Sequence, residues 1–189
     1  TDAAQSGLTT LVDGDIVLVS LAGTITVNEA VSANGSGNIL LSAGGAGSDL
    51  DLNANVTSGT GHITLKAADS LSIAASIAVS TATAGTIAVE ASSGSLTMHG
   101  TATITATNSA LRLYAAGTIT VGNLVATDVS ILSDTGAILN AADSSKNVTA
   151  TNLRLEANGT IGTAARHLTI ATGVLTALSH TSHTYLTED

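Results

Sequence analysis

Two consecutive stretches of 24 residues decide the fold: HITLKAADSLSIAASIAVSTATAG (62–85) and TIAVEASSGSLTMHGTATITATNS (86–109). Each begins with an apolar–x–apolar triplet, Ile63–Leu65 in the first and Ile87–Val89 in the second. A corner of small residues leads to a second triplet, and a third apolar segment follows later in each stretch. Three short strands separated by three corners are typical of one turn of a parallel β-solenoid.

The same register extends along most of the chain. The opening triplets begin at Ile16, Ile39, Ile63, Ile87, Leu111, Val129 and Leu153, with a less regular start at Val174. These starts are 23 or 24 residues apart except for an interval of 18 between Leu111 and Val129, where we expect a turn with a shortened third side. The sequence therefore predicts an all-β fold, a right-handed parallel β-helix of about seven three-sided turns of roughly 24 residues.

The alternation within each triplet predicts which residues form the core. Successive side chains of a strand point to opposite faces, so the two ends of a triplet face inward and its middle residue faces outward. Stacked turns should then build two interior columns on the opening side. The first column contains Ile39, Ile63, Ile87 and Leu111, and the second contains Leu41, Leu65, Val89 and Leu113.

We expect one domain over residues 1–189, because no linker or shift in composition interrupts the register. Residues 1–15 should form a partial entry turn, residues 16–173 the regular turns, and residues 174–189 a frayed or incomplete last turn. No amphipathic helix is predicted at either end to cap the open strand edges. We therefore expect a slice of a longer rod. In isolation, either its tail after about Ser179 is disordered or folded across the last turn, or the segment stacks end to end with another copy.

The composition suits a narrow solenoid and excludes several functions. The 189 residues include 19 Gly but no Pro, Cys, Trp or Phe, so small aliphatic side chains must fill the core in place of aromatic ones. Fourteen acidic against five basic residues give a net charge of −9, which argues against binding to nucleic acid or to anionic membranes. No apolar run is long enough to span a membrane. The lack of Cys fits an extracytoplasmic protein.

Several repeats also resemble a known family. The stretches are GDIVLVSLAGTITV (14–27), GTIAVEASSGSLTM (85–98), LRLYAAGTITVGNL (111–124) and LRLEANGTIGTAARHLTIATGVLTA (153–177). They resemble repeats of filamentous-haemagglutinin-like exoproteins, which are very large bacterial adhesins, secreted or attached to the cell surface and often exported by two-partner secretion. The resemblance covers residues 13–189. The secretion-signal motif of that family is not present here, so the resemblance is to the shaft and not to the export domain.

The resemblance implies a function without chemistry. It suggests a structural and adhesive shaft of a secreted or cell-surface exoprotein, or a self-assembling extracellular filament, and it transfers no catalytic residue and no cofactor. The implied partners are neighbouring repeats of the same parent chain, other copies end to end, and host or environmental glycans or surfaces. Neither nucleic acid nor membrane insertion is implied.

One stretch raises the question of calcium. GGAGSDLDL (44–52) partly matches the glycine-rich nonapeptide that binds calcium in β-roll toxins. It supplies Asp49, but Asp51 stands where that motif has a large apolar residue. The motif also occurs once, whereas such a site takes its ligands from successive copies. A glycine-rich corner is the favoured interpretation, with Asp49 and Asp51 as the metal candidates. His180 and His183 are close in sequence and are interpreted as surface histidines.

The main alternative is a carbohydrate-binding or polysaccharide-degrading β-helix. Such an enzyme gathers carboxylates and basic residues at one place. Arg112 and Arg154 occupy the same middle position two turns apart, with Ser130 between them. The next outward position contains Lys66, Glu90, Tyr114 and Glu156. Mixed charges of this kind are typical of an outer face that keeps a protein soluble. We therefore expect no enzymatic activity and assign no catalytic residue.

Overall fold

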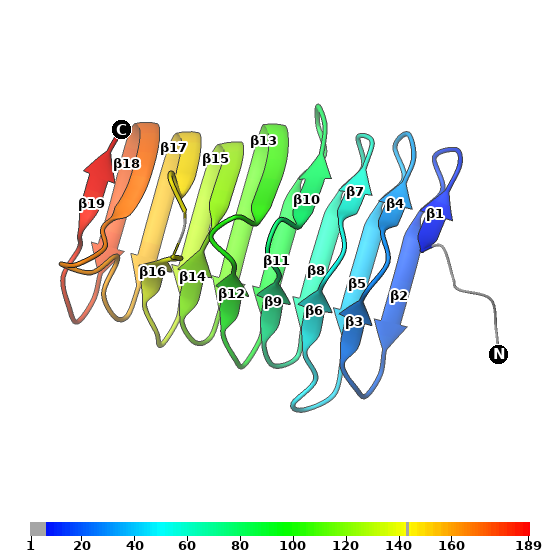
Figure 1. Ribbon diagram of the computed structural model, residues 1–189, viewed down its shortest axis with the longest axis horizontal. Helices are drawn as coiled ribbons and strands as arrows, with labels where there is room; N and C mark the ends of the chain where they lie inside the picture. The colour runs from blue at the N-terminus through cyan, green and yellow to red at the C-terminus, as the bar shows by residue number, and fades with distance from the viewer. Residues whose placement is uncertain (1–6, 143) are drawn as a thin grey trace.

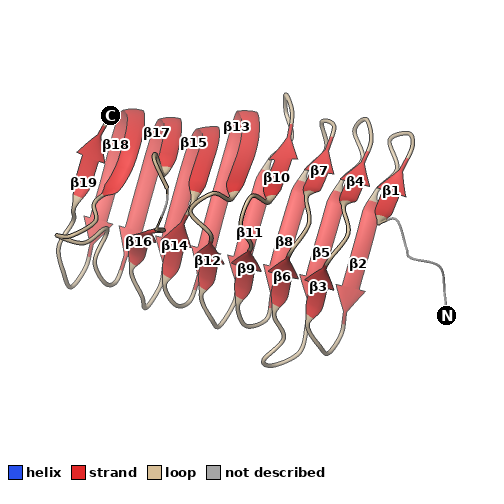
Figure 2. Ribbon diagram, in the orientation of Figure 1, coloured by secondary structure: helices blue, strands red, loops and turns tan. Residues whose placement is uncertain are grey.

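The computed structural model describes residues 7–142 and 144–189, and every regular element within them is a β-strand (Figure 2). The strands wind into successive turns that lie side by side along the long axis, with β1 (Leu8–Thr10) and β2 (Ile16–Ser20) at one end and β19 (Leu186–Glu188) at the other (Figure 1). Neighbouring strands pair in parallel throughout this part of the chain. The protein is an all-β parallel β-solenoid of about seven turns of about 23 residues, as the triplet pattern predicted. The described residues contain no helix long and apolar enough to cross a membrane.

Each turn has three sides, and the corners between them are short. The first side begins with β2 (Ile16–Ser20), β5 (Ile39–Ala43), β8 (Ile63–Ala67) and β11 (Ile87–Ala91). The second side consists of β3 (Ile25–Val27), β6 (Leu50–Leu52), β9 (Leu71–Ile73), β12 (Leu96–Met98), β14 (Ile119–Val121) and β16 (Ile138–Asn140). The third side contains β1 (Leu8–Thr10), β4 (Val31–Ala33), β7 (Val56–Ser58), β10 (Ala78–Thr81) and, at the far end, β19 (Leu186–Glu188).

Further along the chain the third side of one turn continues without a break into the first side of the next. Four long strands do this: β13 (Thr103–Ala115), β15 (Asn123–Ser133), β17 (Val148–Ala157) and β18 (Leu168–Ser179). Their pairing joins the first and third sides into one sheet of 13 strands, while the second side forms a separate sheet of six. The long strands therefore provide a broad, continuous outer face on the C-terminal half of the solenoid.

The two predicted interior columns are confirmed. Ile39, Ile63, Ile87 and Leu111 are register partners in successive strands, and each is at most 1% exposed. Leu41, Leu65, Val89 and Leu113 stack in the same way and are equally buried. A buried alanine follows at the end of these strands, where the first side meets the corner. The core is thus a set of continuous columns of aliphatic side chains.

The 18-residue turn corrects one expectation, because its third side is not shortened. Asn123–Ala126 of β15 pairs residue for residue with Thr103–Ala106 of β13. The corners are shortened instead: only Gly122 connects β14 to β15, whereas four residues connect β12 to β13. At the next corner Thr127 stands opposite three residues, 107–109, that bulge out of β13. The strand is retained because its inward residue, Leu124, fills the core, whereas corner residues can be lost to solvent without opening a cavity.

Of the two alternatives that the sequence left for residues 174–189, a frayed or an incomplete last turn, the first does not hold, because the pairing continues after Val174. Val174–Ser179 forms the second half of β18 and pairs with Asn152–Ala157 of β17. Thr184 then bridges to Ile161, and β19 pairs with the first half of β18. The inward residue of this last repeat is Leu175, 22 residues after Leu153, which explains why the start at Val174 looked irregular.

Candidate functional site

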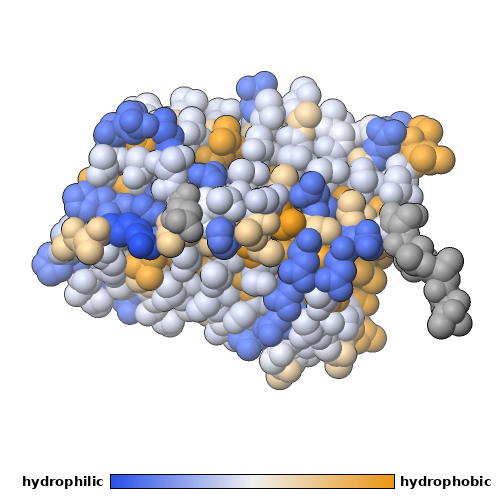
Figure 3. All heavy atoms as spheres, in the orientation of Figure 1, coloured by the Kyte–Doolittle hydropathy of each residue, from blue (hydrophilic) through white to orange (hydrophobic). Residues whose placement is uncertain are grey.

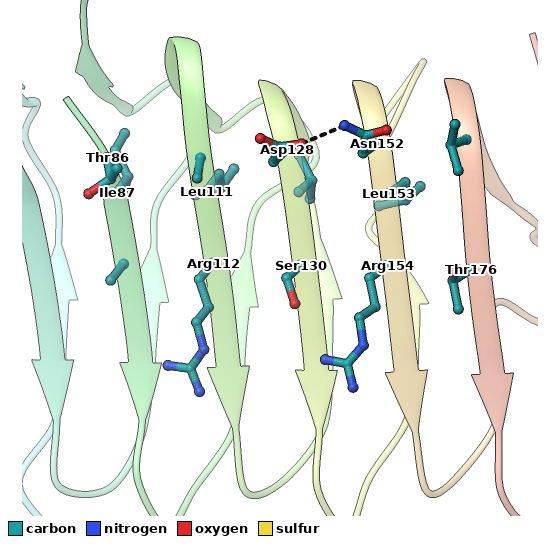
Figure 4. Close-up of a pocket in the computed structure, with 14 residues that line it drawn as sticks. Thr86, Ile87, Leu111, Arg112, Asp128, Ser130, Asn152, Leu153, Arg154 and Thr176 are labelled. Carbon is teal, nitrogen blue, oxygen red and sulfur yellow. Dashed lines mark hydrogen bonds between the residues drawn. The ribbon is translucent and has the colours of Figure 1, made fainter. Parts of the chain in front are cut away.

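A groove of 520 Å³ crosses the outer face of the first side, over β11, β13, β15, β17 and β18 (Figure 4). Its two walls are columns of outward side chains that run parallel to the solenoid axis. The wall at the corner with the third side contains Ala110, Asp128, Asn152 and Val174. The opposite wall contains Ala88, Arg112, Ser130, Arg154 and Thr176. The floor lies over the buried column that includes Leu111, Val129 and Leu153.

The corner wall presents a hydrogen-bonded pair of polar side chains. Asn152 Nδ2 donates to Asp128 Oδ1 over 2.6 Å, and the two residues are register partners in β15 and β17 (Figure 4). Both side chains are exposed, so the pair offers hydrogen-bonding groups to a molecule in the groove. Their spacing of 24 residues equals the repeat, and that spacing is the signal by which the sequence could have revealed this pair. We did not predict it.

The opposite wall presents two guanidinium groups. The side chains of Arg112 and Arg154 extend in the same direction along their strands, away from Asp128 and Asn152, with the short side chain of Ser130 between them (Figure 4). The arginines stand two strands apart, which corresponds to about 9.6 Å at the usual strand spacing. The Arg112 guanidinium carbon lies 5.4 Å from the centroid of the Tyr114 ring, and Arg154 donates to the Glu156 carboxylate. These contacts position both cations on the exposed face.

The next outward column carries charges that pair with one another. Lys66 Nζ lies 3.0 Å from Glu90 Oε1, and His180 Nε2 lies 3.1 Å from Glu156 Oε1. Glu156 therefore contacts both Arg154 and His180. The sequence predicted a column of mixed charge at these positions, and the register confirms that they share one. The order along it is Lys66, Glu90, Tyr114, Leu132 and Glu156, so the charges do not alternate. The Arg112 guanidinium, in the column beside it, lies over the Tyr114 ring.

Glu90 is the titratable group of this face with a clear shift. Burial by itself raises the pKa of the Glu90 carboxyl, but hydrogen bonds from Lys66 and Ser92, together with the charges of Lys66 and Arg112, outweigh it and lower the pKa below its ordinary value. A lowered pKa in the folded state stabilises the fold above the unfolded-state pKa and ceases to do so as the pH falls through the folded-state pKa. Because both members of the pair are partly exposed, the Lys66–Glu90 interaction contributes at most about 1 kcal/mol.

Removal of Lys66 should reverse this shift. In Lys66→Met the burial of Glu90 remains while its main charge partner is lost, so the Glu90 pKa should rise. Its titration, followed by NMR of the side-chain carboxyl carbon, gives the measurement. Lys146→Met is the matched control, because Lys146 pairs with Asp189 elsewhere on the molecule. An unchanged Glu90 pKa in Lys66→Met would show that Lys66 does not hold it down.

The two calcium candidates link successive turns of the second side. Asp49 Oδ1 accepts a hydrogen bond from the backbone N–H of Ser70 over 2.9 Å. Asp51 is the outward middle residue of β6, and its Oδ1 accepts from the Ser72 hydroxyl over 2.6 Å. Within residues 7–142 and 144–189, no three His, Cys, Asp or Glu side chains gather where they could hold a metal ion. Calcium binding at Asp49 and Asp51 stays a prediction.

The histidines near the C-terminus contact separate partners. His180 lies against Glu156, whereas His183 lies with its ring centroid 5.9 Å from that of Tyr185. His167 stacks on the same tyrosine, Tyr185. His180 and His183 thus do not converge on one point, although they are only three positions apart in the sequence.

Comparison with known proteins gives no further guide to this face. No family model, curated protein or solved structure matches the chain. What is shown is the parallel β-solenoid of about seven turns. The groove, with Asp128 and Asn152 on one wall and Arg112 and Arg154 on the other, must therefore be interpreted from its own chemistry.

Proposed function

We propose that this protein is a structural and adhesive shaft segment of a large secreted or cell-surface bacterial exoprotein of the filamentous-haemagglutinin-like kind, without catalysis of its own. The observation that carries the proposal is the unbroken in-register pairing of the first side from β2 to β18. Each turn contacts mainly its neighbours, so a rod of this kind lengthens by adding turns. At about 4.8 Å per strand, seven steps give a rod of about 35 Å.

Side-chain hydrogen bonds that connect successive turns at the corners support a mechanical role. In one corner, Asn38 Nδ2 donates to Asp15 Oδ1 over 2.9 Å, and Asn38 Oδ1 accepts from the backbone N–H of His62 over 2.9 Å. His62 Nδ1 then lies 2.8 Å from the Thr86 hydroxyl. One chain of hydrogen bonds thus connects four successive turns outside the core. Such a ladder resists bending and shear between turns in addition to the backbone hydrogen bonds.

The two ends of the described solenoid offer surfaces for coaxial stacking. Apolar side chains gather at the end formed by β1 and β2 (Figure 3), where Leu11, Val12 and Leu21 are 81%, 77% and 88% exposed. At the other end Leu175 and Leu178 are 40% and 47% exposed. β2 is an edge strand of the described sheet, with Leu18 at the open end of an interior column. We propose that further solenoid turns, from a neighbouring repeat or from a second copy, cover these ends and continue the columns.

This proposal predicts association through the ends that grows with protein concentration and with salt. The net charge of −9 makes two copies repel each other at low salt, and screening relieves that repulsion. Light scattering across a salt series measures the association. Leu18→Lys should abolish it, because it places a charge at the open end of a column. Val125→Lys is the matched control, because Val125 is 44% exposed on the third side, away from both ends.

The outcome separates a shaft from a self-contained domain. Loss of association in Leu18→Lys, with association retained in Val125→Lys, is expected. A monomer at every salt and protein concentration would contradict coaxial stacking of copies. Equal loss in both variants would mean that added positive charge, and not the end of the rod, is responsible.

A second candidate function is the binding of a carbohydrate on the outer face. The groove over β13, β15 and β17 favours it, because its walls combine guanidinium, amide, carboxylate and hydroxyl groups within one elongated depression. A shaft with such a groove would be adhesive along its length, which is compatible with the structural role.

A further inference from the structure

We infer that the groove on the first side binds a linear glycan with a carboxylate on every second sugar, lying along the solenoid axis. This inference rests on the adhesive part of the function proposed above and names its ligand class. It does not depend on whether copies of the rod stack through their ends.

The first argument is the placement of positive charge. The chain has only five Lys and Arg against 14 acidic residues, yet two of the five, Arg112 and Arg154, face the same groove. Their side chains extend in the same direction along the strands, away from the wall that contains Asp128 and Asn152 (Figure 4). A planar guanidinium presents paired donors that match the two oxygens of a carboxylate. In a strongly acidic protein, two guanidinium groups on one wall favour an anionic ligand, which would use the donors that Arg112 and Arg154 keep beyond their contacts with Tyr114 and Glu156.

The second argument is the spacing along the groove. Successive strands lie about 4.8 Å apart, close to the advance per sugar of an extended glycan chain, so each strand can face one sugar. Arg112 and Arg154 belong to β13 and β17, with Ser130 of β15 between them. A ligand that follows this register meets a cation, a small hydroxyl and a second cation. That order fits an acidic sugar, a neutral sugar and another acidic sugar.

The third argument comes from the corner wall. Asp128 and Asn152 stand across the floor from the arginines and are hydrogen-bonded to each other. They supply acceptors and a donor for sugar hydroxyl groups. The Asp128 carboxylate and the net charge of −9 both repel a polymer that is charged at every sugar. The two walls together therefore favour a chain of intermediate charge over a fully carboxylated one and over a neutral one.

The test uses three oligosaccharide probes of equal length. Hyaluronan octasaccharide, which alternates glucuronate with a neutral amino sugar and carries no sulfate, should bind. Fully carboxylated oligogalacturonate and neutral cello-oligosaccharides should bind more weakly. Titration calorimetry gives the affinities, and NMR shifts of the β13, β15 and β17 amides locate the site. Affinity should fall as salt rises, because the contacts are ionic.

The matched variants are Arg112→Gln, Arg154→Gln and Arg166→Gln. Each removes one positive charge, but Arg166 lies outside this groove, beside Asn140 and Thr163. Arg112→Gln and Arg154→Gln should each weaken hyaluronan binding at least about tenfold, the value of one lost hydrogen bond between charged groups. Arg166→Gln should leave it unchanged. Unfolding curves of all three confirm that the fold is kept.

Several results would overturn the inference. Equal weakening in Arg166→Gln would show unspecific attraction to the whole protein. Equal or tighter binding of oligogalacturonate would contradict the alternating register. No binding of any probe would refute the glycan site, while the shaft proposal would still stand or fall on the association through the ends. Reducing ends released during the incubations would show a polysaccharide-degrading enzyme and refute a purely adhesive groove.

Discussion

Leu113→Ala should lower the free energy of unfolding by about 2–5 kcal/mol, one of the two largest effects that we expect. The Leu113 side chain is fully buried and stands between Val89 of the preceding turn and Ile131 of the following one. Truncation removes its buried methyl groups and leaves a cavity between two turns. The strands on both sides are fixed by parallel pairing, so the cavity cannot close without breaking hydrogen bonds. Chemical unfolding followed by circular dichroism gives the measurement.

The control for this prediction is Thr64→Ala. Thr64 is the outward middle residue of β8, between the buried Ile63 and Leu65, so its truncation opens no cavity and should change the unfolding free energy by less than about 0.5 kcal/mol. Similar losses in Leu113→Ala and Thr64→Ala would show that the inward and outward assignments along these strands are wrong.

The contrast between Leu113 and Thr64 also shows why so much of the fold could be predicted. In a solenoid the alternation along a strand determines whether a side chain points inward or outward, and the same orientation recurs at the equivalent position of every turn. The columns through Ile63 and Leu65 were therefore visible in the sequence without knowledge of any long-range contact. A shift of the assigned register by one residue would place every outward threonine in the core and every apolar residue outside, which the apolar pattern excludes.

The corners could not be predicted in the same way. A short turn can lose residues from a strand or from its corners, and the outcome depends on which backbone groups find hydrogen-bond partners. The apolar triplets do not indicate where the residues are lost. Asn108 illustrates the difficulty: it adopts a φ of 55° within the bulge of β13, at a position where Thr127 alone turns the next strand. The tail gave only a weak start at Val174, because its repeat is 22 residues long and its inward residue is Leu175.

The candidate site was predictable only in part. The shared column of Arg112, Ser130 and Arg154 followed from the repeat. The groove did not, because its second wall lies at the corner where β13, β15 and β17 pass from the third side to the first without a break. Sequence alone gave no sign that this corner becomes continuous strand, so Asp128 and Asn152 were not connected with the arginines.

Gly61→Ala should have the second large effect, a loss of about 3 kcal/mol, at the upper end of what overpacking costs. Gly37, Gly61 and Gly85 stack in one corner with their backbones in contact. A Cβ on Gly61 would lie 2.1 Å from the carbonyl oxygen of Gly37 and a Cβ on Gly85 would lie 2.3 Å from that of Gly61, both far closer than atoms can approach. The carbonyls of Gly37 and Gly61 also accept hydrogen bonds, each over 2.7 Å, from the buried hydroxyls of Ser58 and Thr81.

The added methyl group of Gly61→Ala must therefore push two turns apart and weaken these hydrogen bonds together. Gly47→Asn is the control: nothing lies within 4 Å of a Cβ at Gly47, and asparagine tolerates its left-handed φ of +72°. Unfolding curves of the two variants, together with hydrogen exchange at the amides around Gly61, distinguish a local from a general loss. A Gly61→Ala protein as stable as the parent would mean that neighbouring turns can separate at a corner at little cost. The solenoid would then be a compliant rod, and the stiffness on which the shaft proposal depends would have to come from the aliphatic columns alone.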